Sequence, residues 1–302
     1  MTREPRNLAA SVRERLFQLS KARQEDFQLV LQRYAVERLL FRLERSPYQN
    51  RFILKGAMLY LAWGEELYRP TRDLDLLGLG SAELGPIAER FRTVCAIESP
   101  DDGLTFLPAT VRAEEIREGA EYGGVRVRVQ ALLGSARIDL QIDVGFGDAV
   151  VPWPTMVDFP TLLGGPPPRI RAYTQESVVA EKLHAAALLG DTNTRMKDFF
   201  DLFVLSRRFA FEGRTLTSAI AEAFERRQTP LPATIPLRAS FFADDTRAGQ
   251  WRAYLERNGL DTAPRDFTAV GEALREFLVR PYGSLLAGVK SPEAWPPGGP
   301  WG

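Results

Sequence analysis

Apolar residues recur every three or four positions through the first part of the chain. The recurrence runs from Phe27 to Leu43 and includes Val30, Leu31, Tyr34, Leu39 and Leu40. One face of an α-helix has this period. We therefore predict helix over residues 8–46, ended by the Ser46-Pro47 pair, because the residue before a proline disfavours helical backbone.

Short apolar runs bounded by turn residues follow. Residues 52–54 predict a strand, and Gly56 permits a sharp turn into a short helix over residues 57–63. A second strand is predicted over residues 72–77, and an amphipathic helix over residues 81–95.

Alternation of apolar and polar residues predicts a β-hairpin further along. VRVRV, residues 125–129, and RIDLQIDV, residues 137–144, both alternate with period two, and a Gly-Ser turn lies between them. Residues 97–118 alternate short strand and loop. A Pro-rich stretch, residues 153–170, is interpreted as the connection between two lobes.

Helical periods dominate after that connection. Thr174 suits an N-cap and Gly190 suits a C-terminal stop for a helix between them. Further helices are predicted over residues 195–209, 215–228 and 265–280. The end of the chain, SPEAWPPGGPWG, is rich in Pro and Gly and is expected to be frayed.

Composition excludes several classes of function. Lys plus Arg equals Asp plus Glu at 39 each, which excludes a histone-like binder of nucleic acid but not a local basic groove. The single cysteine, Cys95, allows no disulfide within the chain. The single histidine, His184, excludes a multi-histidine zinc site and argues against a Ser-His-Asp triad. No apolar stretch has the length of a membrane span or signal peptide, so we expect a cytoplasmic protein without a membrane partner.

Two aspartates one residue apart stand out in the stretch RPTRDLDLLGLG. On a strand, Asp73 and Asp75 point to the same face and their carboxylates can converge on one site. The return strand of the hairpin offers a third carboxylate. Asp139 and Asp143 share a face of that strand, and either could supply it.

Like charges this close repel each other, and a divalent cation would remove the repulsion. Carboxylate oxygens suit Mg²⁺, with Mn²⁺ as an alternative, and the spacing does not fit a Ca²⁺ loop. We expect a two-metal site with Asp73, Asp75 and a third aspartate as ligands. The competing interpretation is a surface strand with two solvated acids.

The turn Lys55-Gly56-Ala57 precedes this strand. Backbone N–H groups at a glycine turn that opens a helix can bind phosphate oxygens. Lys55 could add a phosphate contact of its own, or it could be an ordinary surface lysine.

These stretches together resemble the AbiEii/AbiGii-type nucleotidyltransferase family. These proteins are the toxin partners of type IV toxin–antitoxin and abortive-infection systems. The resemblance covers about residues 10–210, and more weakly extends to about residue 280. It rests on RYAVERLLFRLERSPYQNRF, KGAMLYLAWGEELYRPTRDLDLLGLG, IDLQIDVGFGD and EKLHAAALLGDTNTRMKDFFDL.

The resemblance implies a DNA-polymerase-β-like nucleotidyltransferase core followed by a helical lobe. The family's Gly-Gly/Ser turn falls on Gly56-Ala57, and Ala57 departs from it because alanine has no hydroxyl to offer a phosphate. The family's acidic pair falls on Asp73 and Asp75, and its third acidic position falls most plausibly on Asp143.

In the helical lobe the resemblance places the family's essential lysine on Lys182 and its later aspartate on Asp198. From the residues alone, a lysine on a partly apolar helix stripe either extends to solvent or faces an anion such as a triphosphate. Asp198 and Asp201 share a helix face. Asp198 could pair with Lys182 or with Arg195, which could itself contact phosphate or RNA, or the acids could be ordinary ion-pair partners.

The sequence therefore predicts an α+β protein with two domains. Residues 1–160 would hold N-terminal helices plus the nucleotidyltransferase core, and residues 161–302 a C-terminal helical domain. We expect transfer of a nucleoside monophosphate from an NTP to an acceptor hydroxyl, by resemblance the 3′ end of a tRNA or another RNA, with a cognate antitoxin as partner. The alternatives are a protein hydroxyl as acceptor and a nucleotide-binding regulatory module without turnover.

Overall fold

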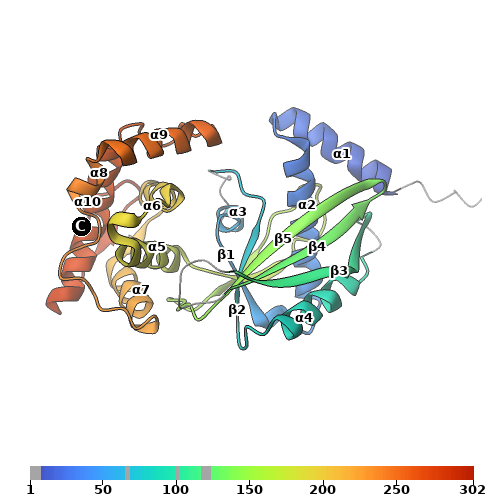
Figure 1. Cartoon of the computed structure of the whole chain (residues 1–302), viewed down its shortest axis with the longest axis horizontal. Helices are drawn as coiled ribbons and strands as arrows, with labels where there is room; N and C mark the ends of the chain where they lie inside the picture. Colours follow the sequence, from blue (N-terminus) through green and yellow to red (C-terminus); the bar gives the residue numbers. More distant parts are fainter. Residues whose placement is uncertain (1–7, 65–68, 100–101, 117–123) are drawn as a thin grey trace, which may run out of the picture. The chain divides into compact units, whose positions relative to one another are not determined.

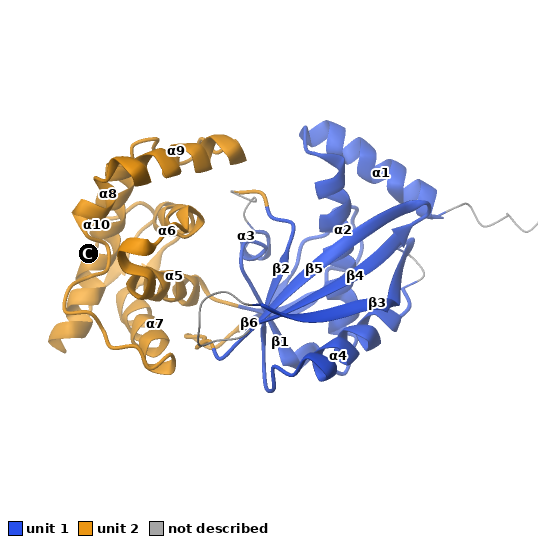
Figure 2. Cartoon of the chain, viewed as in Figure 1, with its two compact units in different colours: residues 1–67, 71–147, 155–172 blue, residues 68–70, 148–154, 173–302 orange. Residues whose placement is uncertain are grey.

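The computed structural model describes residues 8–64, 69–99, 102–116 and 124–302. The chain divides into two compact units, each discontinuous in sequence (Figure 2). Unit 1 takes residues 1–67, 71–147 and 155–172, and unit 2 takes residues 68–70, 148–154 and 173–302. The sequence placed one boundary at 160/161. Unit 1 continues to Ala172 because the strand that ends there belongs to its sheet.

Unit 1 is built on a mixed sheet flanked by helices, which confirms the predicted α+β class (Figure 1). Within the described residues the sheet has seven strands in the order β3-β4-β5-β2-β1-β7-β6. β2 is parallel to β5, and β1 to β7. The elements are α1 Leu8–Arg23, α2 Phe27–Glu44, β1 Phe52–Lys55, α3 Leu59–Ala62, β2 Leu74–Gly78, α4 Leu84–Ala96, β3 Leu104–Ile116, β4 Gly124–Leu133, β5 Ala136–Phe146, β6 Thr155–Asp158 and β7 Arg169–Ala172.

The predicted hairpin is formed by β4 and β5. Leu133 pairs with Ala136, so the loop is the two residues Gly134 and Ser135. Alternation gives the hairpin a buried face, which includes Val127, Val129, Ile138, Leu140 and Ile142. Helices α1, α2 and α4 contact the sheet and close this core. The opposite face carries Arg126, Arg128, Gln130, Asp139, Gln141 and Asp143.

Three parts of unit 1 differ from the sequence prediction. The helical segment at the N-terminus is two helices, because Gln24 has a positive φ of 54° and Asp26 caps α2 by accepting from the Leu29 N–H. β3 is a single long strand with a bulge between Leu107 and Arg112. The Pro-rich connector contains β6 and β7, which extend the sheet beyond β1.

Unit 2 is mainly helical, as expected for the second lobe. The predicted caps of its first helix are found: the Thr174 hydroxyl accepts from the Ser177 N–H, and Gly190 follows the last turn with a φ of 49°. Phe199 and Phe200 of its second helix are buried. The elements are α5 Gln175–Leu189, α6 Met196–Arg208, β8 Phe211–Glu212, α7 Gly213–Arg226, α8 Ala239–Phe242, α9 Asp245–Asn258, α10 Phe267–Ala287 and β9 Ala294–Trp295.

The C-terminal segment is packed, which corrects the expectation of a frayed end. β9 pairs with β8, and the indole N–H of Trp295 donates to the Ser206 carbonyl at 2.8 Å. The Trp301 indole N–H donates to the Phe277 carbonyl at 2.6 Å, and its ring stacks on the ring of Phe277. Two large buried rings outweigh the entropy of a Pro/Gly-rich chain.

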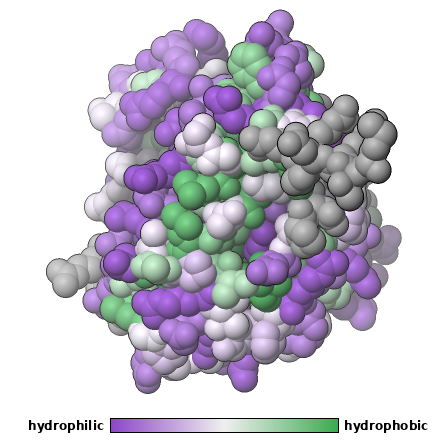
Figure 3. All heavy atoms as spheres, turned by 90° about the vertical axis from the view of Figure 1, so that its right-hand side faces the viewer, coloured by the Kyte–Doolittle hydropathy of each residue, from purple (hydrophilic) through white to green (hydrophobic). Residues whose placement is uncertain are grey.

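The surface in Figure 3 is mostly hydrophilic, with apolar atoms gathered near the centre of the face. Among the helices that the structure describes, none is both long and apolar enough to cross a membrane.

Candidate functional site

A charged row crosses four strands of the unit 1 sheet. Asp75 on β2 lies opposite Lys55 on β1 and opposite Asp143 on β5, and Asp143 lies opposite Arg126 on β4. The hairpin register and the parallel pairing of β2 with β5 together place these four side chains on one face. A cation stands at each end of the row, so each carboxylate has a cation on one side.

The first aspartate of the pair stands at the start of β2. Asp73 lies in the bend directly before Leu74; its charge acts on Arg126, and it lines the same hollow as Arg128 and Gln141, so it lies on the face of the sheet that carries Asp75. Both aspartates are half-buried. The sequence prediction that they share a face is therefore met by the geometry.

The glycine turn lies directly against the acidic pair. Gly56 has a φ of 71°, a backbone conformation that residues with a Cβ rarely adopt. A Cβ added there would overlap the carboxylate of Asp75. Two separate constraints therefore require glycine at position 56: the backbone conformation, and the space that the Asp75 carboxylate occupies. Ala57, next to it, is buried.

The strand register distinguishes the two candidates for the third carboxylate. Asp143 lies beside Asp75 across the β2–β5 pairing. Asp139 lies four residues earlier on β5, which at the rise of a strand separates it from Asp143 by about 13 Å. Asp139 instead accepts from the Gln130 side-chain amide at 2.8 Å. The geometry therefore favours Asp143 as the neighbour of the acidic pair.

Asp143 is held by an arginine that the sequence analysis did not single out. The Nε and Nη2 atoms of Arg126 donate to its two oxygens at 2.9 and 2.8 Å. These hydrogen bonds to Asp143, helped by the charge of nearby Asp73, raise the pKa of Arg126. The arginine is a permanent cation at the edge of the acidic pair.

The donor set fits a divalent cation in chemical type, since every candidate is a carboxylate oxygen. The arrangement fits less well. Among the residues that the structure describes, no three acids, histidines or cysteines are grouped closely enough to hold a metal ion. Arg126 takes both oxygens of Asp143, so only Asp73 and Asp75 suit an ion without a change in these hydrogen bonds.

Unit 2 contains a second charged cluster, centred on Lys182 of α5. Its ammonium lies 2.9 Å from Asp198 Oδ1 and 2.9 Å from Asp201 Oδ2, both on α6. Arg69 binds the two oxygens of Asp201 at 2.8 and 3.1 Å, and Arg195 lies 2.8 Å from Asp198. The structure thus joins the predicted Lys182, Asp198 and Arg195, and adds Arg69 and Asp201.

The protonation of this cluster follows from its burial. Burial opposes charge on the buried Asp201, yet Lys182 and Arg69 outweigh it and hold its pKa at about 2. Burial likewise lowers the pKa of Lys182, and the two aspartates more than reverse this. Lys182 and its two aspartates are therefore charged at neutral pH, and the two carboxylates hold Lys182 in one position.

His184 lies on the same helix as Lys182 but is separate from this cluster. Its Nε2 is 2.9 Å from the Thr229 hydroxyl and its Nδ1 is 3.1 Å from Arg227. The side chain is buried. Its packing is that of a structural residue rather than a catalytic one.

A profile of the family described as "Nucleotidyl transferase AbiEii toxin, Type IV TA system" matches residues 38–276. The chain belongs to this family. It is therefore a nucleotidyltransferase toxin of a type IV toxin–antitoxin system, which implies an antitoxin partner. This confirms the resemblance drawn from the sequence motifs.

Two solved structures are similar to this AbiEii-family chain. JHP933 from Helicobacter pylori has a TM-score of 0.50 and 17% identity, over 87% of this chain and 98% of that one. A putative nucleotidyltransferase from H. pylori has a TM-score of 0.46 and 17% identity, over 87% and 94%. The first shows that the fold of this chain also occurs in a solved structure. No curated protein matches the chain.

Sequence reasoning missed two residues of these charged clusters, Arg126 and Arg69, and gave a third, Asp201, no definite role. Arg126 could have been found by counting outward from the Gly-Ser turn, which places it opposite Asp143. Asp201 was noted only as an acid on the same helix face as Asp198, although it binds both Lys182 and Arg69. Nothing in the local sequence connects Arg69 with Asp201, which is 132 residues away.

Proposed function

We propose that this toxin transfers a nucleoside monophosphate from an NTP to the 3′-terminal hydroxyl of a tRNA. The observation that carries the proposal is the pairing of Asp75 with Asp143 on neighbouring strands, with the Gly56 turn against Asp75. Carboxylates beside a glycine turn suit a site that holds a triphosphate and its cation.

The proposed reaction is a substitution at phosphorus. The acceptor hydroxyl oxygen forms a bond to the α-phosphorus of the NTP, and the bond from that phosphorus to the bridging oxygen breaks. Pyrophosphate leaves with the electron pair, and the hydroxyl proton passes to a carboxylate or to water. Transfer to an RNA hydroxyl would give a phosphodiester.

Mg²⁺, or Mn²⁺ in its place, is the proposed cofactor. Asp73 and Asp75 would hold it, and Asp143 would join them after releasing Arg126. The bound ion would lower the charge of the triphosphate and of the leaving pyrophosphate.

Residues of the chain itself supply the rest. Backbone N–H groups of the Gly56-Ala57 turn and the Lys55 ammonium are the proposed triphosphate contacts in unit 1. In unit 2, Lys182 and Arg195 are the proposed phosphate contacts, and Asp198 with Asp201 fixes the position of Lys182.

The test is incubation of the purified protein with Mg²⁺, each α-³²P-labelled NTP and total tRNA. Wild type should label tRNA with one or a few of the nucleotides. Asp75→Asn should lower the transfer rate at least about 100-fold, since it removes a carboxylate that would hold the cation at the reacting phosphate. Asp158→Asn is the matched control, because Asp158 is an exposed acid on β6 of the same sheet, and it should keep the wild-type rate.

Three results would redirect the proposal. Label on protein rather than tRNA would favour a protein hydroxyl as acceptor. Bound NTP without any transfer would favour the regulatory module. Equal rates for Asp75→Asn and wild type would remove the acidic row from the site.

A further inference from the structure

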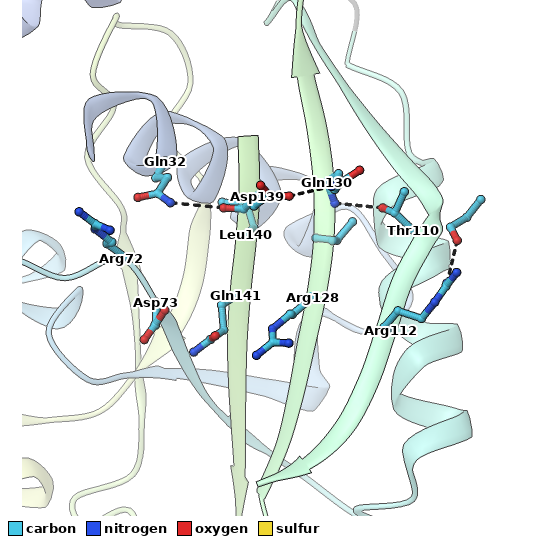
Figure 4. Close-up of a pocket in the computed structure, with 12 residues that line it drawn as sticks. Gln32, Arg72, Asp73, Thr110, Arg112, Arg128, Gln130, Asp139, Leu140 and Gln141 are labelled. Carbon is cyan, nitrogen blue, oxygen red and sulfur yellow. Dashed lines mark hydrogen bonds between the residues drawn. The ribbon is translucent and has the colours of Figure 1, made fainter. Parts of the chain in front are cut away.

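A hollow of about 550 Å³ opens on the polar face of the unit 1 sheet (Figure 4). Strands β4 and β5 form its floor, and Gln32 of α2, Arg72 and the bulge of β3 form its edges. Arg128 and Gln141 in the floor are each two residues from the Arg126–Asp143 pair. The hollow therefore begins one pleat from the charged row, and Asp73 lines it directly.

Arginines stand on opposite sides of the hollow. Figure 4 shows Arg72 on the side of Asp73 and Arg128 on β4, across Gln141. Arg72 is exposed, and among the described residues its side chain has no hydrogen-bond or ion-pair partner. Arg128 pairs with Glu114, and both side chains are more than half exposed, so that pair is weak. Both guanidinium groups can bind an anion at little cost.

Arg112, the third arginine that lines the hollow among the described residues, has a structural role. Its Nη1 atom donates to the Ala109 and Val111 carbonyls at 2.9 Å each and so braces the bulge of β3. These hydrogen bonds hold its guanidinium against the β3 backbone, away from a ligand-binding role.

Amide side chains provide the rest of the polar lining. Gln32, Gln130 and Gln141 line the hollow, and Asp139 holds the Gln130 amide. Amides can donate to and accept from the edges of a nucleobase, and guanidinium planes can stack on its face. Val129 and Leu140 also line the hollow, but their side chains are buried on the opposite face of the sheet. They therefore contribute only backbone atoms to the hollow, which has no apolar pocket at these positions.

We infer that this hollow binds the terminal nucleotides of the acceptor RNA strand, with Arg72 and Arg128 on successive phosphates and the glutamines on base edges. A strand lying there would reach Asp73 with its 3′ end. A triphosphate concentrates its charge at one end, whereas the arginines are spread across the hollow, as suits a chain with one charge per nucleotide. The inference rests on the proposed function for the identity of the bound strand.

The test measures binding without turnover. The probe is a 5′-fluorescein single-stranded RNA 12-mer with a free 3′ hydroxyl, and fluorescence anisotropy is recorded over a salt series with no NTP present. The variant Arg72→Ala/Arg128→Ala should raise Kd at least about tenfold. It should also reduce the slope of log K against log salt by about 0.7 for each phosphate that an arginine no longer neutralises. Binding of labelled NTP should stay at the wild-type level.

The matched control is Arg92→Ala/Arg169→Ala. Arg169 is exposed and Arg92 partly exposed; both lie in unit 1 outside the hollow and pair with an acid, as Arg128 does. Circular dichroism melts check that both double variants fold. Arg128→Lys combined with Arg72→Ala should keep about half of the salt slope that the double alanine variant loses, because it restores one of the two charges and binding a phosphate needs charge more than shape.

Equal RNA affinity in the double variant and the control would overturn the inference, as would failure of wild type to bind the 12-mer. Unchanged RNA binding with reduced labelling of a protein acceptor would also overturn it, in favour of a protein-binding hollow. RNA binding lost only in the Arg72/Arg128 variant, in a protein that never transfers nucleotide to RNA, would keep the hollow and reject the proposed function.

Discussion

The guanidinium of Arg126 donates to both carboxylate oxygens of Asp143, at 2.9 and 2.8 Å. The pair lies in the same row as Asp75, so an arginine occupies the side of the acidic row where the proposed metal would need a third ligand. Arg126 and a cation at Asp143 would compete, because both are drawn to the same two oxygens.

Replacement of Arg126 should expose this competition. Arg126→Gln should lower the metal-free stability by about 1 kcal/mol, since a partly exposed pair contributes little more than that. Mg²⁺ or Mn²⁺ should then bind about tenfold more tightly, because Asp143 no longer has to release a cation. Thermal melts over a metal titration measure both effects. Identical metal stabilisation of variant and wild type would show that Arg126 does not compete.

The Gly56 turn should tolerate no side chain. Gly56→Ala puts a Cβ on the carboxylate of Asp75 and forces a φ of 71° on alanine. We expect at least about a 100-fold loss of transfer rate and about 1–3 kcal/mol of stability. Gly64→Ala is the control: its φ is 80°, and nothing lies within 4 Å of the added Cβ. If both variants lose activity equally, backbone strain and not the carboxylate is the cause.

The cluster around Lys182 should be essential for the stability of unit 2. Asp201→Asn leaves the buried Lys182 and Arg69 with one carboxylate fewer and should cost about 3 kcal/mol in urea unfolding. The pKa of Asp201 is depressed to about 2, so its stabilisation is present above the unfolded value of about 3.9 and lost as pH falls toward 2. In Asp201→Asn the free energy of unfolding should therefore fall less steeply over this pH range than it does in wild type.

Asp191→Asn serves as the comparison for Asp201, because its pair with Arg238 is exposed on both sides. It should change stability by less than about 0.5 kcal/mol. A similarly small effect for Asp201→Asn would mean that the buried cluster is not a stabilising network.

The single histidine gives a direct readout of its surroundings. Burial, and then the charge of Arg227, lowers the pKa of His184 to about 4, against a small opposing effect of Asp148. Its proton NMR signal should therefore stay unchanged from pH 8 to about 5.5. Because the folded pKa is depressed below about 6.5, this stabilisation is present above about pH 6.5 and lost as pH falls toward 4. His184→Gln should flatten that pH dependence, and a normal titration near about 6.5 in wild type would refute the burial.

Local patterns in the sequence were enough to predict the hairpin, the caps of α5 and the face shared by Asp73 and Asp75. Each of these features depends on the spacing of apolar and polar residues along the chain, or on the backbone preference of a single residue. β6 and β7 were missed because β7 joins the sheet by pairing with β1, more than about 100 residues earlier in the chain, and β6 in turn pairs with β7; no window of sequence reports that long-range pairing. The same distinction holds for the candidate site, where only residues in local motifs were predicted. Lys182 and Asp198 were found through motifs, whereas Arg69 depends on a contact made only in the folded chain.

The packed C-terminal segment has a spectroscopic consequence. The chain has five tryptophans, and the three that are deeply buried, Trp251, Trp295 and Trp301, all belong to unit 2. Intrinsic fluorescence will therefore follow the melting of unit 2 and be nearly blind to that of the sheet. A fluorescence curve and a far-ultraviolet dichroism curve will superimpose only if the sheet of unit 1 and the helical unit unfold as one cooperative body.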